Sequence, residues 1–221
     1  MRAASNAMTC KQLHYRNIDA RTAADGELMN GQFLMSKLIF GMWFAWGLYW
    51  AVSARDAKRS VRREALASRA THLVPLIVGA LLVALPHVPS ALFATRILPA
   101  TIATYWIGVA TVFVGLAFAV WARRHIGSNW SGTVTVKEDH ALVRTGPYGL
   151  VRHPIYTALL LAILGSGVAR GELRGVWAFA LCTISFAVKL RLEEHWMRQA
   201  FGEEYARYSA EVPALIPLWP R

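Results

Sequence analysis

The sequence predicts an all-α integral membrane protein with about five transmembrane helices, and the prediction follows from composition and from the clustering of apolar residues. Of its 221 residues, 55% are hydrophobic and only 17% are charged, with a mean hydropathy of +0.34. A soluble domain of this size would carry about 25% charged residues. The apolar residues also form long runs separated by basic loops, which is the pattern of membrane-spanning helices.

Three apolar runs are long enough to span a bilayer, which takes about 20 residues. They cover residues 33–52, 73–94 and 98–122. The second run contains three prolines, and the third contains no charged residue. We expect residues 1–32 to form a polar N-terminal extension and residues 33–97 to hold the N-terminal membrane helices. Residues 98–221 would then form the remaining membrane domain.

Two shorter runs, residues 154–169 and 175–188, are joined by the sequence Arg-Gly-Glu-Leu-Arg. A short polar turn between two helices of similar length predicts a helical hairpin, the last two of the five helices. Pro154 suits the first turn of a helix because it has no amide hydrogen to leave unpaired. The sequence therefore predicts that a helix begins at Pro154.

An arginine and a histidine stand at the start of this helix, where unpaired N–H groups favour an anion rather than a cation. Arg152 and His153 precede Pro154 directly, and Tyr148 and Tyr156 lie close by. Stability alone would favour Asp or Ser at such a position. The combination indicates a site that binds something polar or anionic at the membrane edge.

Basic residues predict the orientation of the chain. They are dense within residues 55–69, 123–152 and 191–207, whereas the connection over residues 86–97 holds only Arg96. Cytoplasmic loops carry an excess of Lys and Arg. We therefore expect the N-terminus outside and the C-terminus in the cytosol. The net charge of +11 fits contact with anionic lipid headgroups, so we expect no nucleic-acid partner.

The C-terminal tail predicts a helix, and the cysteines show no metal-binding pattern. Residues 190–210 predict a separate amphipathic helix, with Arg191, Glu194 and Arg198 on one charged face. The two cysteines, Cys10 and Cys182, form no CxxC or Cys/His cluster, so we expect no metal site.

Polar residues from three segments are expected to meet on the cytosolic side, because the hairpin brings its two outer ends together. The segments contain His140 to Val143, then Tyr148, Arg152, His153 and Tyr156, and finally Lys189, Arg191, Glu193, Glu194 and His195. Each residue alone fits a headgroup anchor, a helix cap or a solvated face. Together at membrane depth, where polar groups are costly, they indicate a functional site.

The run GPYGLVRHPIYTALLL (residues 146–161) and the later run RLEEHWMRQAFGEEYARYSAEVPALIP (residues 191–217) resemble the isoprenylcysteine carboxyl methyltransferase family. Members of this family are integral membrane enzymes that use S-adenosyl-L-methionine. The resemblance covers about residues 98–220 and is that of a short bacterial-type member, which implies a bacterial inner membrane as the location. It implies that residues 98–221 are the catalytic domain, with the cytosolic loop and the tail forming the cofactor site.

The resemblance implies a role for each matching residue. The cofactor-binding set is His140, Ala141, Leu142 and Val143 at the adenosine end, Tyr148, the segment His153, Pro154, Ile155 and Tyr156 around the methionine part, and Glu193 at the amino group. The catalytic candidates are Arg152, Lys189, Arg191 and Glu194. Lys189 takes the place of an arginine that faces the substrate in eukaryotic members, and Arg152 suits the carboxylate of the cofactor.

Several functions, with different methyl acceptors or none, are compatible with these residues. Methyl transfer needs positioning and no metal, and the family default is O-methylation of a prenylcysteine-like carboxylate. Lys189 lacks the forked donors of arginine, and Thr157 with Ala158 follows the RHPxY element where glycine is usual. The alternatives are a thiol or phospholipid-amine methyltransferase of the same superfamily, a membrane sterol-type reductase that binds a nicotinamide cofactor, and a non-enzymatic membrane assembly protein.

Overall fold

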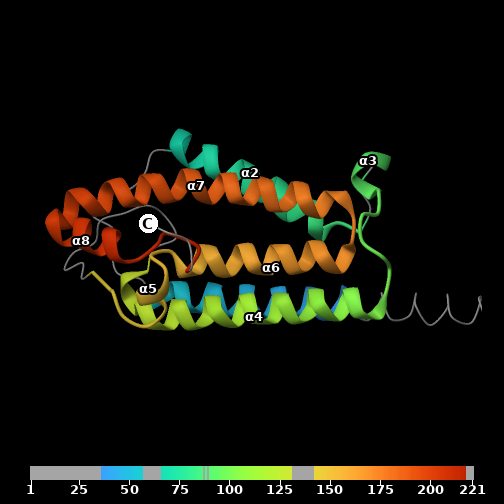
Figure 1. The fold of residues 1–221 in the computed structure, drawn as a ribbon, viewed down its shortest axis with the longest axis horizontal. Helices are drawn as coiled ribbons and strands as arrows, with labels where there is room; N and C mark the ends of the chain where they lie inside the picture. Colours follow the sequence, from blue (N-terminus) through green and yellow to red (C-terminus); the bar gives the residue numbers. More distant parts are fainter. Residues whose placement is uncertain (1–35, 57–65, 87, 89, 131–141, 218–221) are drawn as a thin grey trace, which may run out of the picture.

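A computed structural model describes residues 36–56, 66–86, 88, 90–130 and 142–217, and within these ranges the chain is helical and has no β-strand. The long helices lie side by side along the length of the molecule (Figure 1). They are a helix at residues 36–53, α2 (Leu66–Ala84), α4 (Ile102–Ile126), α6 (Pro154–Arg170) and α7 (Leu173–Phe201). Short helices α3 (Ala91–Ala94), α5 (Pro147–Leu150) and α8 (Glu203–Glu211) lie at the two ends of this bundle (Figure 1). The all-α prediction is confirmed.

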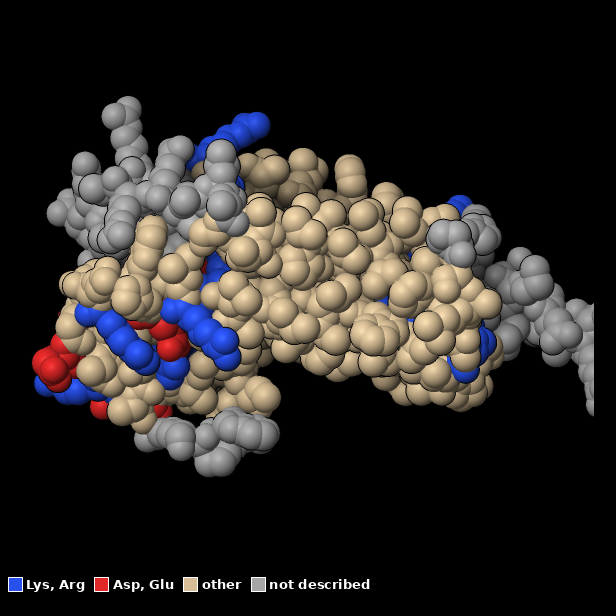
Figure 2. Space-filling model, turned by 90° about the horizontal axis from the view of Figure 1, so that it is seen from above, with Lys and Arg blue, Asp and Glu red and all other residues tan. Residues whose placement is uncertain are grey.

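The surface of the bundle is that of a membrane protein. Among the described residues, α4 and α7 are long and apolar enough to cross a membrane, while residues 68–84 and α6 are shorter apolar helices. Large apolar side chains such as Phe44, Phe113 and Ile184 are exposed by 66%, 64% and 56%. Figure 2 shows the charged side chains gathered toward the ends of the molecule, with an apolar belt between them. Lipid rather than water suits such a belt.

Small residues allow α4 and α6 to pack closely. A Cβ atom on Gly108 of α4 would lie 2.5 Å from the Cβ of Ala169 and 2.7 Å from the carbonyl oxygen of Gly165, both on α6. Small residues serve this purpose in membrane bundles, where apolar burial does not drive helices together. Polar contacts add to the packing, because the indole Nε1 of Trp43 donates to the Ser166 hydroxyl at 3.1 Å. The first helix is thereby fixed to α6.

The turn between α6 and α7 confirms the predicted hairpin and explains its arginines. Gly171 turns the chain at a φ of +66°. Arg170 donates to the carbonyl of Val83, and Arg174 donates to that of Leu85 at 2.9 Å. The last carbonyls of a helix have no partner within it. These two arginines therefore cap α2 at the end of the bundle opposite the candidate site.

Two sequence predictions are wrong in their boundaries. The second apolar run is not one helix over residues 73–94, because α2 begins earlier and ends at Ala84, two residues before Pro86. The separate amphipathic helix at residues 190–210 does not exist either. α7 continues without a break to Phe201, Gly202 turns the chain at a φ of +50°, and α8 follows. As a result, α7 extends well past the start of α6 (Figure 1).

Candidate active site

The candidate site lies where the start of α6 meets the extended end of α7. α6 begins at Pro154 as predicted, with His153 as its N-cap residue. The apolar run of α7 ends at Val188, so Glu193 and Glu194 lie beyond the predicted membrane-spanning part, where α7 continues without a break. The structure thus brings the arginine–histidine pair and the glutamate pair together, as the sequence predicted.

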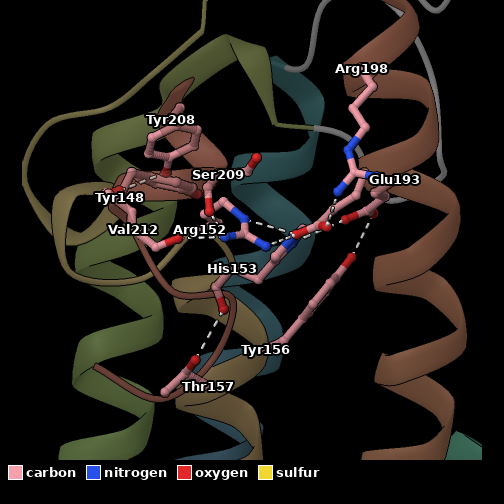
Figure 3. A network of polar contacts seen from close by, with 11 residues as sticks. Tyr148, Arg152, His153, Tyr156, Thr157, Glu193, Arg198, Tyr208, Ser209 and Val212 are labelled. Carbon is pink, nitrogen blue, oxygen red and sulfur yellow. Dashed lines mark hydrogen bonds and ion pairs between the residues drawn. The ribbon is translucent and has the colours of Figure 1, made fainter. Parts of the chain in front are cut away.

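Arg152 lies at the centre of a buried polar network (Figure 3). Its Nε and Nη2 atoms donate to Oε1 of Glu194 at 2.8 and 2.6 Å, and both side chains are 11% exposed. Its Nη1 atom donates to the carbonyl of Ser209 at 3.0 Å and to that of Val212. Acceptors within the chain thus engage all three guanidinium nitrogens of Arg152.

Glu193, the neighbour of Glu194 on α7, has a different environment. The hydroxyl of Tyr156 donates to its Oε1 atom at 2.6 Å (Figure 3). Lys189 Nζ lies 3.9 Å from the same oxygen, and His153 Nδ1 lies 3.6 Å from Oε2. The side chain of Glu193 is 22% exposed, twice the value for Glu194. Glu193 therefore keeps acceptor capacity that Glu194 has largely used.

His153 lies between the two carboxylates and stacks on Tyr156. Its Nε2 atom is 3.3 Å from Oε1 of Glu194, and its ring centroid is 5.4 Å from that of Tyr156, nearly parallel. The ring of Tyr156 in turn stacks on Phe186 at 4.8 Å. This aromatic stack joins the polar network to the apolar core of α6 and α7.

Protonation follows from these contacts. Burial lowers the pKa of His153, but hydrogen bonds and charges of Glu193 and Glu194 outweigh it and raise that pKa above its usual value. Burial raises the pKa of Glu194, yet His153 and Arg152 lower it to about 2. The pKa of Glu193 is also lowered, because His153, Lys189 and Tyr156 outweigh its burial. Both carboxylates are therefore ionised at neutral pH.

Tyr148 is buried against the C-terminal part of the chain. It is 7% exposed, and its carbonyl accepts the hydroxyl of Tyr208 at 2.6 Å. Its ring lies 6.4 Å from that of His125. Burial raises the pKa of the Tyr148 hydroxyl, so it stays protonated. Arg144 connects the same elements, since it pairs with Glu211 at 2.8 Å.

The remaining predicted residues lie around this network or outside the described ranges. Pro154 is buried, Ile155, Leu142, Val143 and Lys189 are partly buried, and Arg191 is exposed. His140 and Ala141 lie outside the described residues. His195 is exposed and contacts Gln199 rather than the glutamate pair.

Sequence reasoning missed the contribution of α8 and of the residues that follow it. Ser209 and Val212 provide carbonyls to Arg152, and Thr157 donates to the carbonyl of Leu215 at 2.7 Å. Main-chain carbonyls carry no residue signature, so composition gave no direct signal for them. The tyrosines at positions 205 and 208, buried to 2% and 3% exposure, were the available sign that this segment packs inward.

The part of the chain that contains these residues is similar to known proteins. The phospholipid methyltransferase family model (PEMT) matches residues 103–204, which include every candidate site residue from His140 to Glu194. Protein-S-isoprenylcysteine O-methyltransferase B of Arabidopsis thaliana is 29% identical over 119 residues, covering 51% of this chain and 60% of that protein. Over these residues the chain is similar to the phospholipid methyltransferase family and to isoprenylcysteine O-methyltransferases. The resemblance identified from the sequence motifs is confirmed.

Two further matches are a relative with a different name and a solved structure. CzcN of Cupriavidus metallidurans, named a cobalt-zinc-cadmium resistance protein, is 33% identical over 94 residues, covering 42% of this chain and 43% of that protein. The solved structure of the eukaryotic intramembrane Ras methyltransferase ICMT (isoprenylcysteine carboxyl methyltransferase) aligns at 20% identity with a TM-score of 0.48, covering 69% of this chain and 51% of that one. The chain spans about half the length of the curated relatives it matches.

Proposed function

We propose that this chain is an S-adenosyl-L-methionine-dependent methyltransferase that acts on a lipophilic acceptor at the membrane. The default acceptor is the carboxylate of a prenylcysteine-like molecule. The observation that carries the proposal is the position of Glu193, an ionised and partly exposed carboxylate in the family-matched part of the chain. It lies at the end of α7, beside the predicted membrane-spanning segments.

Glu193 suits the ammonium group of the cofactor. A carboxylate has about four lone-pair positions, and one of those on Glu193 is taken by the short hydrogen bond from Tyr156. The contacts to His153 and Lys189 are longer, at 3.6 and 3.9 Å, so acceptor positions remain. An ammonium partner would therefore meet a charge that is already fixed in place.

The adenosine end is assigned to the other cofactor-binding candidates. Tyr148 fixes the turn at α5, while Leu142 and Val143 provide partly buried apolar surface directly before it. His140 and Ala141 continue this segment, and Pro154 with Ile155 lines the start of α6. When bound, S-adenosyl-L-methionine would supply a methyl group carried on a sulfonium sulfur.

Lys189 is the residue we assign to the acceptor carboxylate. Its ammonium lies 5.5 Å from the centre of the Tyr156 ring and 3.9 Å from Glu193, and its side chain is 16% exposed. A cation here would hold a carboxylate beside the cofactor position, and the protein contribution would be orientation and exclusion of water. Arg191 is exposed two residues further along α7, where it suits anionic headgroups.

The membrane arrangement follows from the same account. The five long helices would be five spans, with the N-terminus outside and the site on the cytosolic face of a bacterial inner membrane. The long helices of the described chain alternate in direction along the bundle (Figure 1). Reporter fusions after residues 90 and 217 test this, since only the second is expected to report the cytosol.

The test of cofactor binding is calorimetry with S-adenosylhomocysteine on the detergent-purified protein. Wild type is expected to bind at micromolar concentration, and Glu193→Gln to lose at least tenfold in affinity. Glu204→Gln, an exposed glutamate on α8, is the matched control and is expected to bind like wild type. A folded, monodisperse wild type that binds no S-adenosylhomocysteine would overturn the proposal, and nicotinamide cofactors would then be tested for the reductase alternative.

A further inference from the structure

We propose that Arg152, Glu194 and Thr157 are positioning residues. They hold the end of α8 and the residues that follow it (residues 209–215, hereafter the C-terminal strap) against the start of α6 and thereby fix His153 and Glu193 for ligand contact. This inference rests on the proposed function, because the ligand in question is the methyl donor. It assigns different roles to the two neighbouring glutamates.

Arg152 connects three parts of the chain that are distant in sequence. One side of its guanidinium donates twice to Glu194 of α7, and Nη1 donates to the carbonyls of Ser209 and Val212 (Figure 3). Arginine has five N–H donors in a rigid fork, and the three nitrogens that carry them all have acceptors within the chain. An arginine engaged in this way acts through its neighbours rather than by binding a ligand.

The backbone before α6 is bound to the C-terminal strap as well. The amide of Arg152 donates to the carbonyl of Pro213 at 2.9 Å, and the amide of His153 donates to that of Ala214 at 3.0 Å. Amides at a helix start have no acceptor within the helix and are available to an anion. Here the C-terminal strap occupies the two amides that precede Pro154, so these amides are not available to an anionic ligand.

Thr157 fastens the end of the C-terminal strap. Its hydroxyl donates to the carbonyl of Leu215 at 2.7 Å, one turn along α6 from His153. A residue without a side-chain hydroxyl at this position could not make this bond. Thr157 therefore provides a way to loosen the C-terminal strap without touching the ionic pair.

The two neighbouring glutamates make different contacts because successive residues on a helix point about 100° apart. Oε1 of Glu194 has three nitrogen partners within 3.3 Å, from Arg152 and His153, and the residue is 8% exposed. Glu193 faces Tyr156 and Lys189 and is more exposed. His153 contacts both glutamates, so displacement of Glu194 moves the ring that contacts Glu193.

The experiment compares ligand affinity with amide exchange. For each variant, S-adenosylhomocysteine affinity is measured by calorimetry, and hydrogen–deuterium exchange at residues 152 and 153 is followed by mass spectrometry. Arg152→Lys is expected to bind about tenfold more weakly and to exchange faster, because lysine lacks the fork. Thr157→Val is expected to show both effects at about threefold. Glu193→Gln is expected to lose affinity without faster exchange, and Arg207→Lys, an exposed control on α8, to change neither.

The outcomes separate this inference from the proposed function. Weaker binding by Arg152→Lys and Thr157→Val with unchanged exchange would overturn it, because these residues would then act on the ligand directly. Faster exchange with unchanged affinity would also overturn it. If wild type binds no S-adenosylhomocysteine, the proposed function fails, whereas slow exchange in wild type and fast exchange in Thr157→Val would still show the attachment. Should Arg152→Lys not fold, Thr157→Val decides the question alone.

Discussion

Replacing Glu194 by glutamine is expected to destabilise the protein in a way that depends on pH. The pKa of Glu194 lies near 2 instead of 4.5, because His153 and Arg152 outweigh its burial. At about 1.4 kcal/mol per pKa unit, this shift corresponds to about 3 kcal/mol of folding free energy. The residue is only 8% exposed, so little of this is lost to screening by water.

The effect on melting follows from this magnitude. For a chain of this length, 1 kcal/mol shifts Tm by about 2–4 °C, so Glu194→Gln is expected to lower Tm by about 6–12 °C at pH 7. The folded-state pKa is below the unfolded one, so the contribution is present above about pH 4.5 and disappears as pH falls toward 2. The Tm difference between wild type and variant should therefore shrink with acidification over that range.

The assay is thermal unfolding in detergent by intrinsic fluorescence, at a series of pH values from 7 to 2.5. Glu204→Gln, the exposed glutamate on α8, controls for the loss of one negative charge and should melt like wild type throughout. Equal melting of wild type and Glu194→Gln at pH 7, or a difference that grows on acidification, would refute the reasoning.

Three further predictions concern other contacts. Tyr156→Phe removes the 2.6 Å hydrogen bond to Glu193 and should therefore raise the pKa of Glu193. It should also weaken S-adenosylhomocysteine binding about five- to tenfold in calorimetry. Unchanged affinity would mean that Glu193 does not contact this ligand. Arg174→Ala removes the donor that caps α2 and should lower Tm by several degrees. The folded variant should bind S-adenosylhomocysteine like wild type, because Arg174 lies at the end of the bundle opposite the candidate site. A loss of affinity would contradict that separation. Gly108→Ala places a Cβ 2.5 Å from that of Ala169 and should lower the free energy of unfolding by about 1–3 kcal/mol. The control is Gly47→Ala, whose Cβ would have nothing within 4 Å and which should melt like wild type. Equal melting of the two variants would mean that α4 and α6 are not closely packed.

Local chemical signals predicted the part of the fold that positions the site. The proline at position 154 predicted where α6 begins, and the polar turn over residues 170–174 predicted the hairpin. From these two features alone, Arg152 and His153 were expected near Glu193 and Glu194, and the structure confirms that proximity. The cause is general, since antiparallel helices joined by a short turn must bring their outer ends together.

The boundaries of α2 and α7 were missed for a physical reason. An apolar run marks the part of a helix that lipid or core covers, and the helix itself continues until a residue breaks it. α7 has no glycine or proline between Gly175 and Gly202, and the polar residues beyond Val188 are good helix formers. α2 begins in the polar stretch before Leu73, and Pro86 and the capping arginines mark its other end.

The C-terminal strap was not predictable because its contacts use the main chain. Pro213 and Ala214 accept backbone hydrogen bonds from Arg152 and His153, and any residue provides such a carbonyl. Arg152 was expected to meet an anionic ligand, and the sequence alone gave no way to see that Glu194 and the C-terminal strap engage its donors.

The most direct test of the account is transfer of labelled methyl from S-adenosyl-L-methionine to a farnesylated N-acetylcysteine by the detergent-purified protein. Wild type is expected to form a base-labile methyl ester, and Glu193→Gln is expected to react at least tenfold more slowly under conditions that do not saturate the cofactor site. A parallel screen of small thiols and phospholipid amines covers the other acceptors. Protein that is folded and binds S-adenosylhomocysteine but methylates none of these would contradict the assignment as a methyltransferase.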